Sequence, residues 1–130
     1  MKKILLTALV AVSALTANGQ VWLGGSLGYT HTDADGIEAT VVNMHTIKPL
    51  DKELVVKVAK ATNKVFTLEE HSTIGGLGSA VAECLCDEYP CKVTRIGIND
   101  VFGESGPAGE LIAKYGLDAK SIYEKVKAEM

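Results

Sequence analysis

The sequence is poor in aromatic residues, in proline and in cysteine. Phe, Trp and Tyr make up 5% of the 130 residues, and there are only three prolines and three cysteines. The apolar residues, 47% of the chain, are therefore mostly Val, Ile, Leu and Ala. That mixture favours buried parallel strands covered by helices over an all-β sandwich. The length suits one domain of ordinary size with its own hydrophobic core.

The chain also lacks an excess of positive charge and any run of like charges. Its formal net charge is −3. A nucleic-acid surface needs a basic patch, so we expect no nucleic-acid partner. The cysteines Cys84, Cys86 and Cys91 form an odd, clustered set, which is a poor disulfide framework. Their spacing does not fit zinc either, so we expect small core thiols and no metal site.

The first nineteen residues have the pattern of a secretory signal peptide. Met1-Lys2-Lys3 is a short positive region, and Ile4–Ala17 is an apolar run. The run is too short to cross a bilayer as a stable helix, so we expect no stable membrane span. Ala17-Asn18-Gly19 then supplies small residues for cleavage. The pattern predicts a signal peptide over 1–19 and export to the periplasm or outer membrane; the alternative is a buried N-terminal helix.

Residues 20–34 differ in character from the segments on both sides. The stretch Gln20–Thr32 combines glycines with Trp22 and Tyr29 in a strand-like run. It resembles the opening strand of a Gram-negative outer-membrane β-barrel protein. No further ten-residue segments of alternating hydrophobicity follow, so we expect no barrel after it. We treat 20–34 as a separate barrel-strand-like segment and start the main domain at residue 35.

From residue 35 onward, short apolar strands alternate with amphipathic helices. Strands are predicted at 41–44, 64–70 and 91–98. Helices are predicted from Asp51, from Leu77, after Pro107 and from Asp118, where aspartates act as N-caps and proline stands in a first turn. The order is strand–helix–strand–helix–strand–helix–helix. It predicts an α/β fold, a three-layer α/β/α arrangement around a mainly parallel sheet with right-handed crossovers.

Five stretches of this region carry a resemblance to a known family. They are VNMHTIKPLD from Val42, EEHSTIGGLGS from Glu69, RIG from Arg95, FGESG from Phe102 and LIAKYGL from Leu111. Together they resemble the C-terminal domain of the transketolase family over residues 35–130. The resemblance is greatest to split transketolases, whose C-terminal half is a separate subunit.

The resemblance implies one part of an enzyme rather than a complete one. The family transfers two-carbon ketol units between sugar phosphates, using thiamine diphosphate and Mg held between two other domains at a dimer interface. We therefore expect no catalytic or cofactor-binding residue here, and no cofactor bound by this part alone. The expected partners are other domains or subunits of a transketolase-like enzyme, with a homodimer as a further expectation.

The family pattern also begins with a strand and a helix ahead of residue 35. The signal-peptide-like and barrel-like segments stand in their place. We expect this first strand and helix to be missing, which would expose a sheet edge.

The Gly75-Gly76-Leu77-Gly78 stretch is a candidate anion site. It follows a predicted strand and opens a predicted helix, where backbone N–H groups and the helix dipole attract anions. It matches neither GxGxxG nor a Walker A motif, so the signal is weak. The alternative is a tight turn with close packing of helix on sheet, which places Gly75, Gly76 and Gly78 there for steric reasons.

Three further residues are candidates for a ligand or an interface. His71 and His45 each follow a predicted strand, at the edge of an α/β sheet where ligands collect. The alternative is that both only hold their loops. Arg95 lies within a predicted strand, and we expect it to pair with an acid at the surface or at an interface. No nucleophile accompanies these residues.

The sequence leaves open whether the chain works in an enzyme. The first hypothesis is a transketolase-like domain with an assembly role, inactive alone and by family normally cytoplasmic. The second is an exported, non-enzymatic α/β binding or interaction module. The third is a chimeric gene product joined near Asp33–Asp35, because a sugar-phosphate enzyme has no substrate supply outside the inner membrane.

Overall fold

The computed structural model describes residues 2–9, 29–34 and 37–130. From β3 onward, strands and helices follow one another in the order that the sequence predicts, which confirms the α/β fold. The strands are β1 (Lys2–Leu9), β2 (Tyr29–Ala34), β3 (Ile37–Asn43), β4 (Val65–Ser72) and β5 (Val93–Ile98). The helices are α1 (Lys52–Thr62), α2 (Leu77–Glu88), α3 (Ala108–Lys114) and α4 (Ala119–Ala128).

The five strands form one sheet in the order β2-β3-β1-β4-β5. The pairs β3–β1, β1–β4 and β4–β5 are parallel, and only β2 runs antiparallel, against β3. The mainly parallel sheet of the sequence prediction is therefore present. The carboxyl ends of β3, β1, β4 and β5 consequently lie along one edge.

β1 is the strand that the sequence analysis did not expect. Lys2–Ala8 pairs with Ile37–Asn43 of β3, and Leu5–Leu9 pairs with Val65–Glu69 of β4. The expectation of a missing first strand with an exposed edge therefore differs from the structure, in which this apolar segment fills a central position. Near-continuous apolar runs are typical of the strands of parallel sheets that have helices on both faces.

The two N-terminal segments proposed from the sequence thus both contribute strands. β1 lies within the predicted signal peptide, and β2 lies within the 20–34 segment and pairs with the start of the main domain. The structure does not describe residues 20–28 of that segment or the proposed cleavage position after Gly19. The prediction that the family's first helix is missing also concerns residues outside the described ones.

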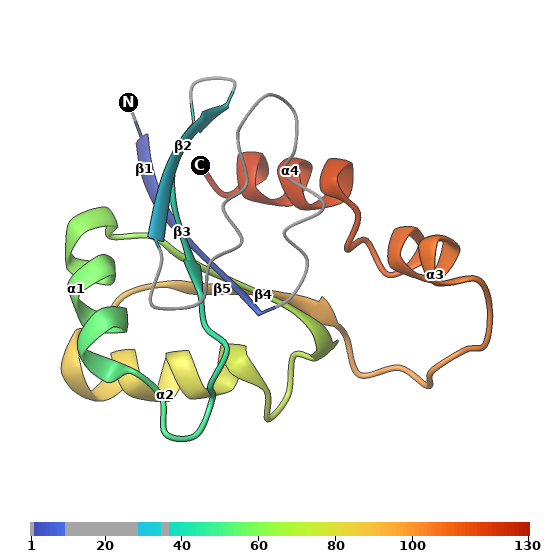
Figure 1. Cartoon of the computed structure of the whole chain (residues 1–130), viewed down its shortest axis with the longest axis horizontal. Helices are drawn as coiled ribbons and strands as arrows, with labels where there is room; N and C mark the ends of the chain where they lie inside the picture. The colour runs from blue at the N-terminus through green and yellow to red at the C-terminus, as the bar shows by residue number, and fades with distance from the viewer. Residues whose placement is uncertain (1, 10–28, 35–36) are drawn as a thin grey trace.

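Helices cover the sheet on both faces, giving three layers (Figure 1). Along β4, Val65 packs under α1 and α2, whereas Phe66 and Leu68 point to the opposite face, toward α4. The first core also contains Val55, Val58 and Ala59 of α1 with Leu77, Val81, Cys84 and Leu85 of α2. The second contains Ala39, Ile96, Leu117, Ile122 and Val126.

The predicted helix caps are present. The Asp51 carboxylate accepts a hydrogen bond from the Leu54 N–H at 3.0 Å, and Asp118 accepts one from Ser121 at 3.4 Å. The bond to Ser121 lowers the pKa of the Asp118 carboxyl below its ordinary value. Gly116, just after α3, has φ of +66°, the left-handed conformation with which glycine commonly ends a helix.

α3 packs loosely on the domain. An amphipathic helix is expected to bury its apolar face. The apolar residues Leu111 and Ile112 of α3 and Tyr115 at its end are nevertheless only half-buried, and α3 has no buried residue. In Figure 1 α3 projects from the body of the domain, beyond the end of the sheet. A search of the described helices found none with the length and apolar character needed to cross a bilayer.

Candidate functional site

The candidate site lies where β4 and β5 end side by side. The segment after β4 leads into α2, and the segment after β5 leads toward α3. The Thr73 N–H donates to the Ile98 carbonyl at 3.0 Å and ties the two segments together. Ligands of open α/β sheets bind at this kind of edge, and the predicted site residues lie at or near it.

Glu69 is the buried polar centre of this edge. Its side chain is 1% exposed, although its neighbour Glu70 is exposed, as their alternation along the strand predicts. Its two carboxylate oxygens accept hydrogen bonds from the Leu77 N–H at 2.7 Å and from the Gly78 N–H at 2.8 Å. These are the first free amides of α2, where the helix dipole favours negative charge.

This arrangement gives the start of α2 an anion of its own. The amides of Leu77 and Gly78, which an external anion would need, are already bonded to Glu69. An anion site at Gly75, Gly76 and Gly78 was predicted from the sequence. In the structure, two of the N–H donors that such a site would use already bind the Glu69 carboxylate.

Close packing requires glycine at two of the three positions, and a left-handed backbone favours it at the third. A Cβ at Gly76 would stand 2.0 Å from the Glu69 Oε2 atom, and one at Gly78 would stand 2.7 Å from the Arg95 Cγ atom. Gly75 has φ of +77°, and its N–H donates to the Ser79 hydroxyl at 2.9 Å. The structure thus has the features of the alternative considered from the sequence, a tight turn packed closely on the sheet.

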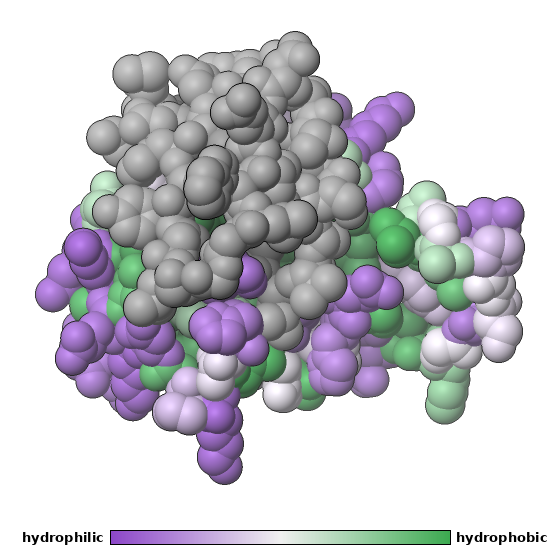
Figure 2. Space-filling view, viewed as in Figure 1, coloured by the Kyte–Doolittle hydropathy of each residue, from purple (hydrophilic) through white to green (hydrophobic). Residues whose placement is uncertain are grey.

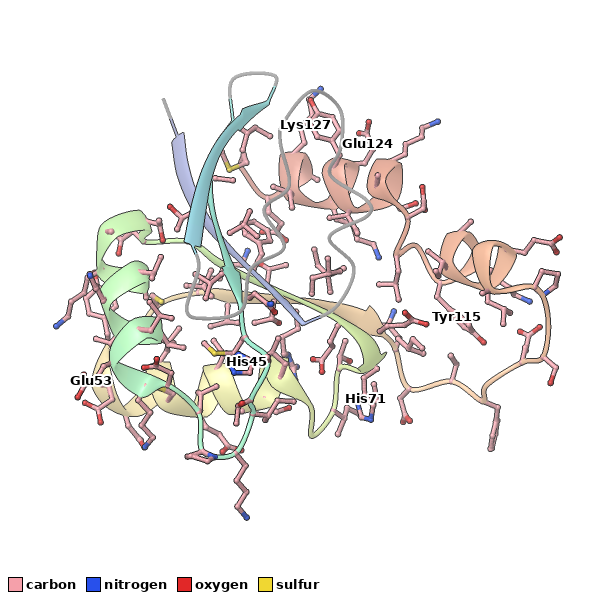
Figure 3. The ribbon with its side chains drawn as sticks, viewed as in Figure 1. His45, Glu53, His71, Tyr115, Glu124 and Lys127 are labelled. Carbon is pink, nitrogen blue, oxygen red and sulfur yellow. The ribbon has the colours of Figure 1, made fainter. Side chains whose placement is uncertain are left out.

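The two histidines are both exposed at this end of the sheet (Figure 3). The His71 Nδ1 atom lies 3.1 Å from the Ser72 carbonyl oxygen. His45 follows β3, and β1 separates β3 from β4 in the sheet. The two residues therefore come from strands that are not neighbours.

Arg95 holds the turn after β4. Its guanidinium donates to the Thr73 carbonyl oxygen at 2.9 Å. Among the described residues, the hydrogen bond recorded for Arg95 is thus to a main-chain carbonyl. Pairing of Arg95 with an acid at an interface stays a prediction.

Arg95 also borders a shallow hollow of about 560 Å³ beside α2. The hollow contains two of the three thiols, Cys86 and Cys91, together with Glu83 and Pro90. Ser79, Ala82 and Val93 complete its lining. Burial raises the pKa of the Cys91 thiol, which keeps it protonated and a poor nucleophile.

The three thiols should react with iodoacetamide in an order set by their exposure. Cys86 is exposed, Cys91 is half-buried, and Cys84 is 3% exposed with its pKa raised by burial. We expect alkylation of Cys86 to be at least about tenfold faster than that of Cys84 at pH 8, because the thiolate must form and be reached. Peptide mass spectrometry over time measures the order. In urea the three should react alike, and early labelling of Cys84 in the native protein would contradict the packing of α2.

The described residues do not fit a diphosphate and its metal ion. Among residues 2–9, 29–34 and 37–130, no group of three or more His, Cys, Asp or Glu side chains could hold a metal. The helix amides suited to a phosphate are bonded to Glu69.

The comparisons with known proteins follow the fold. A model of the family described as "Transketolase, C-terminal domain" matches residues 30–122, beginning inside β2. The chain belongs to the transketolase C-terminal domain family. This membership confirms the resemblance noted from the sequence.

Relatives of this transketolase C-terminal domain include separate subunits and parts of longer enzymes. The putative transketolase C-terminal section of Methanocaldococcus jannaschii is 50% identical over 97 residues, covering 74% of this chain and 30% of that protein. The 6-deoxy-6-sulfo-D-fructose transketolase subunit SqwH of a Clostridium species is 51% identical, covering 67% of this chain and 27% of that protein. The 1-deoxy-D-xylulose-5-phosphate synthase of Heliobacterium modesticaldum is 45% identical. The match covers 69% of this chain and 14% of that protein.

A solved structure is also similar to this chain. It is described as a split gene transketolase, an inactive beta4 tetramer. Its TM-score is 0.77 at 43% identity, with 98% of this chain and 39% of that chain covered. The chain thus spans about 30% of the first curated relative it matches, and between a quarter and a third of the second.

Sequence reasoning missed two features of the site. The first is the role of Glu69, which was named only as the start of EEHSTIGGLGS and was given no partner. A glutamate at the end of a strand, followed by a glycine-rich turn into a helix, was the available signal. Sequence reasoning also did not single out Phe102, whose exposure no sequence pattern indicates.

Proposed function

We propose that this chain is an assembly domain of a transketolase-like enzyme, inactive alone and dependent on companion domains or subunits. Those companions would hold thiamine diphosphate and Mg, and the complete enzyme would transfer two-carbon ketol units between sugar phosphates. The observation that carries the proposal is the family match over residues 30–122, on a fold that aligns with a split transketolase over 98% of the chain.

The geometry of the domain favours an assembly role. Its buried carboxylate Glu69 is used internally to fix the start of α2. A domain built this way would contribute rigid surface to an assembly. The chemistry would be done by groups on the companions.

Complementation in trans tests the proposal. The full chain is mixed with the Methanocaldococcus jannaschii C-terminal section truncated before its own matching domain, together with the section that completes that enzyme. We expect ketol transfer to rise above the mixture without the chain, whereas the chain alone gives none. An equal mass of serum albumin is the control. No gain over albumin would count against the proposal.

Export through residues 1–19 is a separate proposal, supported by the charge and hydropathy pattern of Met1–Gly19. It conflicts with the fold, because cleavage after Gly19 would remove β1 (Lys2–Leu9) from the centre of the sheet. The intact mass of the protein recovered from periplasmic and cytoplasmic fractions distinguishes the two fates.

A further inference from the structure

The segment between β5 and α3 is exposed along its whole length. Every residue from 99 to 110 is exposed. We call residues 99–107 the arm. Near its start Val101 is 58% exposed and Phe102 is 99% exposed, so a complete aromatic ring stands in solvent. Figure 1 shows the arm and α3 projecting from the body, and Figure 2 shows apolar residues on this projecting part.

The arm is nevertheless held in place. The Glu104 carboxylate forms an ion pair with Lys114 of α3 at 2.6 Å. The Glu104 N–H donates to the Tyr115 hydroxyl at 3.2 Å. A segment fixed on α3 in this way has already lost part of the conformational freedom that binding would otherwise remove. Its exposure is therefore not that of an untethered loop.

The arm also carries charge of one sign. Asp100 and Glu104 are its only ionisable residues, and Glu110 follows in α3. Lys114 offsets Glu104, which leaves Asp100 beside the apolar pair Val101 and Phe102. A complementary surface would have an apolar pocket for the ring and a basic rim for the aspartate.

A third exposed apolar residue lies in the turn before α2. Ile74 is 62% exposed. The bond from Thr73 to Ile98 holds this turn beside the end of β5, where the arm begins. Large apolar side chains left in solvent beside polar residues are typical of interaction sites.

We propose that Phe102 anchors this domain to a companion subunit of the transketolase-like enzyme, entering an apolar pocket rimmed by lysine or arginine. The inference rests on the proposed function and names the surface through which it operates. An aromatic anchor surrounded by polar residues is the usual form of an interface hot spot. The acidic neighbour sets orientation and association rate more than affinity.

Binding of arm variants tests the proposal. The probe is the same truncated Methanocaldococcus jannaschii assembly, titrated calorimetrically with the full chain. We expect Phe102→Ala to weaken binding by at least about tenfold and Phe102→Leu by less, because leucine still fills an apolar pocket. Asp100→Asn should lower the salt dependence of the affinity with a smaller change in the affinity itself. Lys120→Ala, on the exposed side of α4, is the surface control.

The outcomes separate this proposal from the one it rests on. Because the Phe102 ring is exposed, Phe102→Ala should leave the urea midpoint unchanged, so weaker binding cannot be misfolding. Equal binding by wild type and Phe102→Ala overturns the anchor and leaves the assembly role standing. No binding by wild type overturns both. A change confined to self-association in light scattering makes a second copy the partner and overturns the companion pocket.

Discussion

Removing residues 1–19 should abolish the cooperative unfolding of this domain. β1 pairs with β3 along Lys2–Ala8 and with β4 along Leu5–Leu9, so its loss takes ladder bonds from both neighbours. The sheet would be divided between β3 and β4, and each would gain an open edge. The free energy of unfolding of a domain this size is about 5–15 kcal/mol. We expect the loss of a central strand to cost more than this. Urea unfolding of chains 20–130 and 1–130, followed by circular dichroism, measures the difference.

A pair of proline substitutions tests the same strand without shortening the chain. Thr7 lies in the middle of β1 and pairs with both Val42 and Thr67. Thr7→Pro removes a ladder donor from a central strand, which we expect to cost about 3 kcal/mol or more. Lys2, the first residue of β1, pairs only with Ile37 in the described register. Lys2→Pro should therefore cost much less.

The opposite result would be equally informative. If 20–130 unfolded with the midpoint of the full chain, β1 would be dispensable and cleavage after Gly19 would be compatible with a folded product. Soluble 20–130 that associates through exposed strands would instead fit two open edges.

The reason β1 was not predicted lies in what an apolar run can encode. Lys2–Leu9 has two lysines followed by apolar residues interrupted only by Thr7, which suits a signal peptide and a central parallel strand equally. Periodicity cannot separate them, because a strand buried on both faces does not alternate. Only the pairing with β3 and β4 identifies the strand, and those partners are distant in sequence.

The order of strands and helices in 37–130 was predictable because its signals are local. Asp51 and Asp118 cap helices that begin one residue later. The role of Glu69 was not predictable, because it depends on where α2 begins relative to the end of β4. Phe102 was not predictable for a different reason. Sequence reasoning expects an aromatic residue to be buried, and only the structure shows that it is 99% exposed.

Substitution of Glu69 should be the most damaging single change near the site. Glu69→Ala leaves the N–H groups of Leu77 and Gly78 without a partner in a buried position and opens a cavity. We expect a loss of about 3–5 kcal/mol in the free energy of unfolding. Glu69→Gln keeps the shape, but its amide group offers one acceptor for two donors, so we expect about 2–3 kcal/mol.

The neighbouring Glu70 is the matched control for this prediction. It has the same side chain, lies one residue along β4 and is exposed. Glu70→Gln and Glu70→Ala should each change the free energy of unfolding by less than about 0.5 kcal/mol. Urea denaturation of the four variants with the wild type measures the contrast. Equal effects at Glu69 and Glu70 would mean that the carboxylate does not hold the start of α2.

A small carboxylate added to Glu69→Ala distinguishes a lost anion from a lost side chain. The variant would present the free amides of Leu77 and Gly78 at a helix N-terminus with space beside them. Acetate should then raise the unfolding midpoint of Glu69→Ala relative to chloride at equal ionic strength, because only the native state binds it. The wild type should show no such gain, since Glu69 already fills the position. Acetate stabilising both proteins equally would indicate a general salt effect, and the glycine turn would regain its standing as an open anion site.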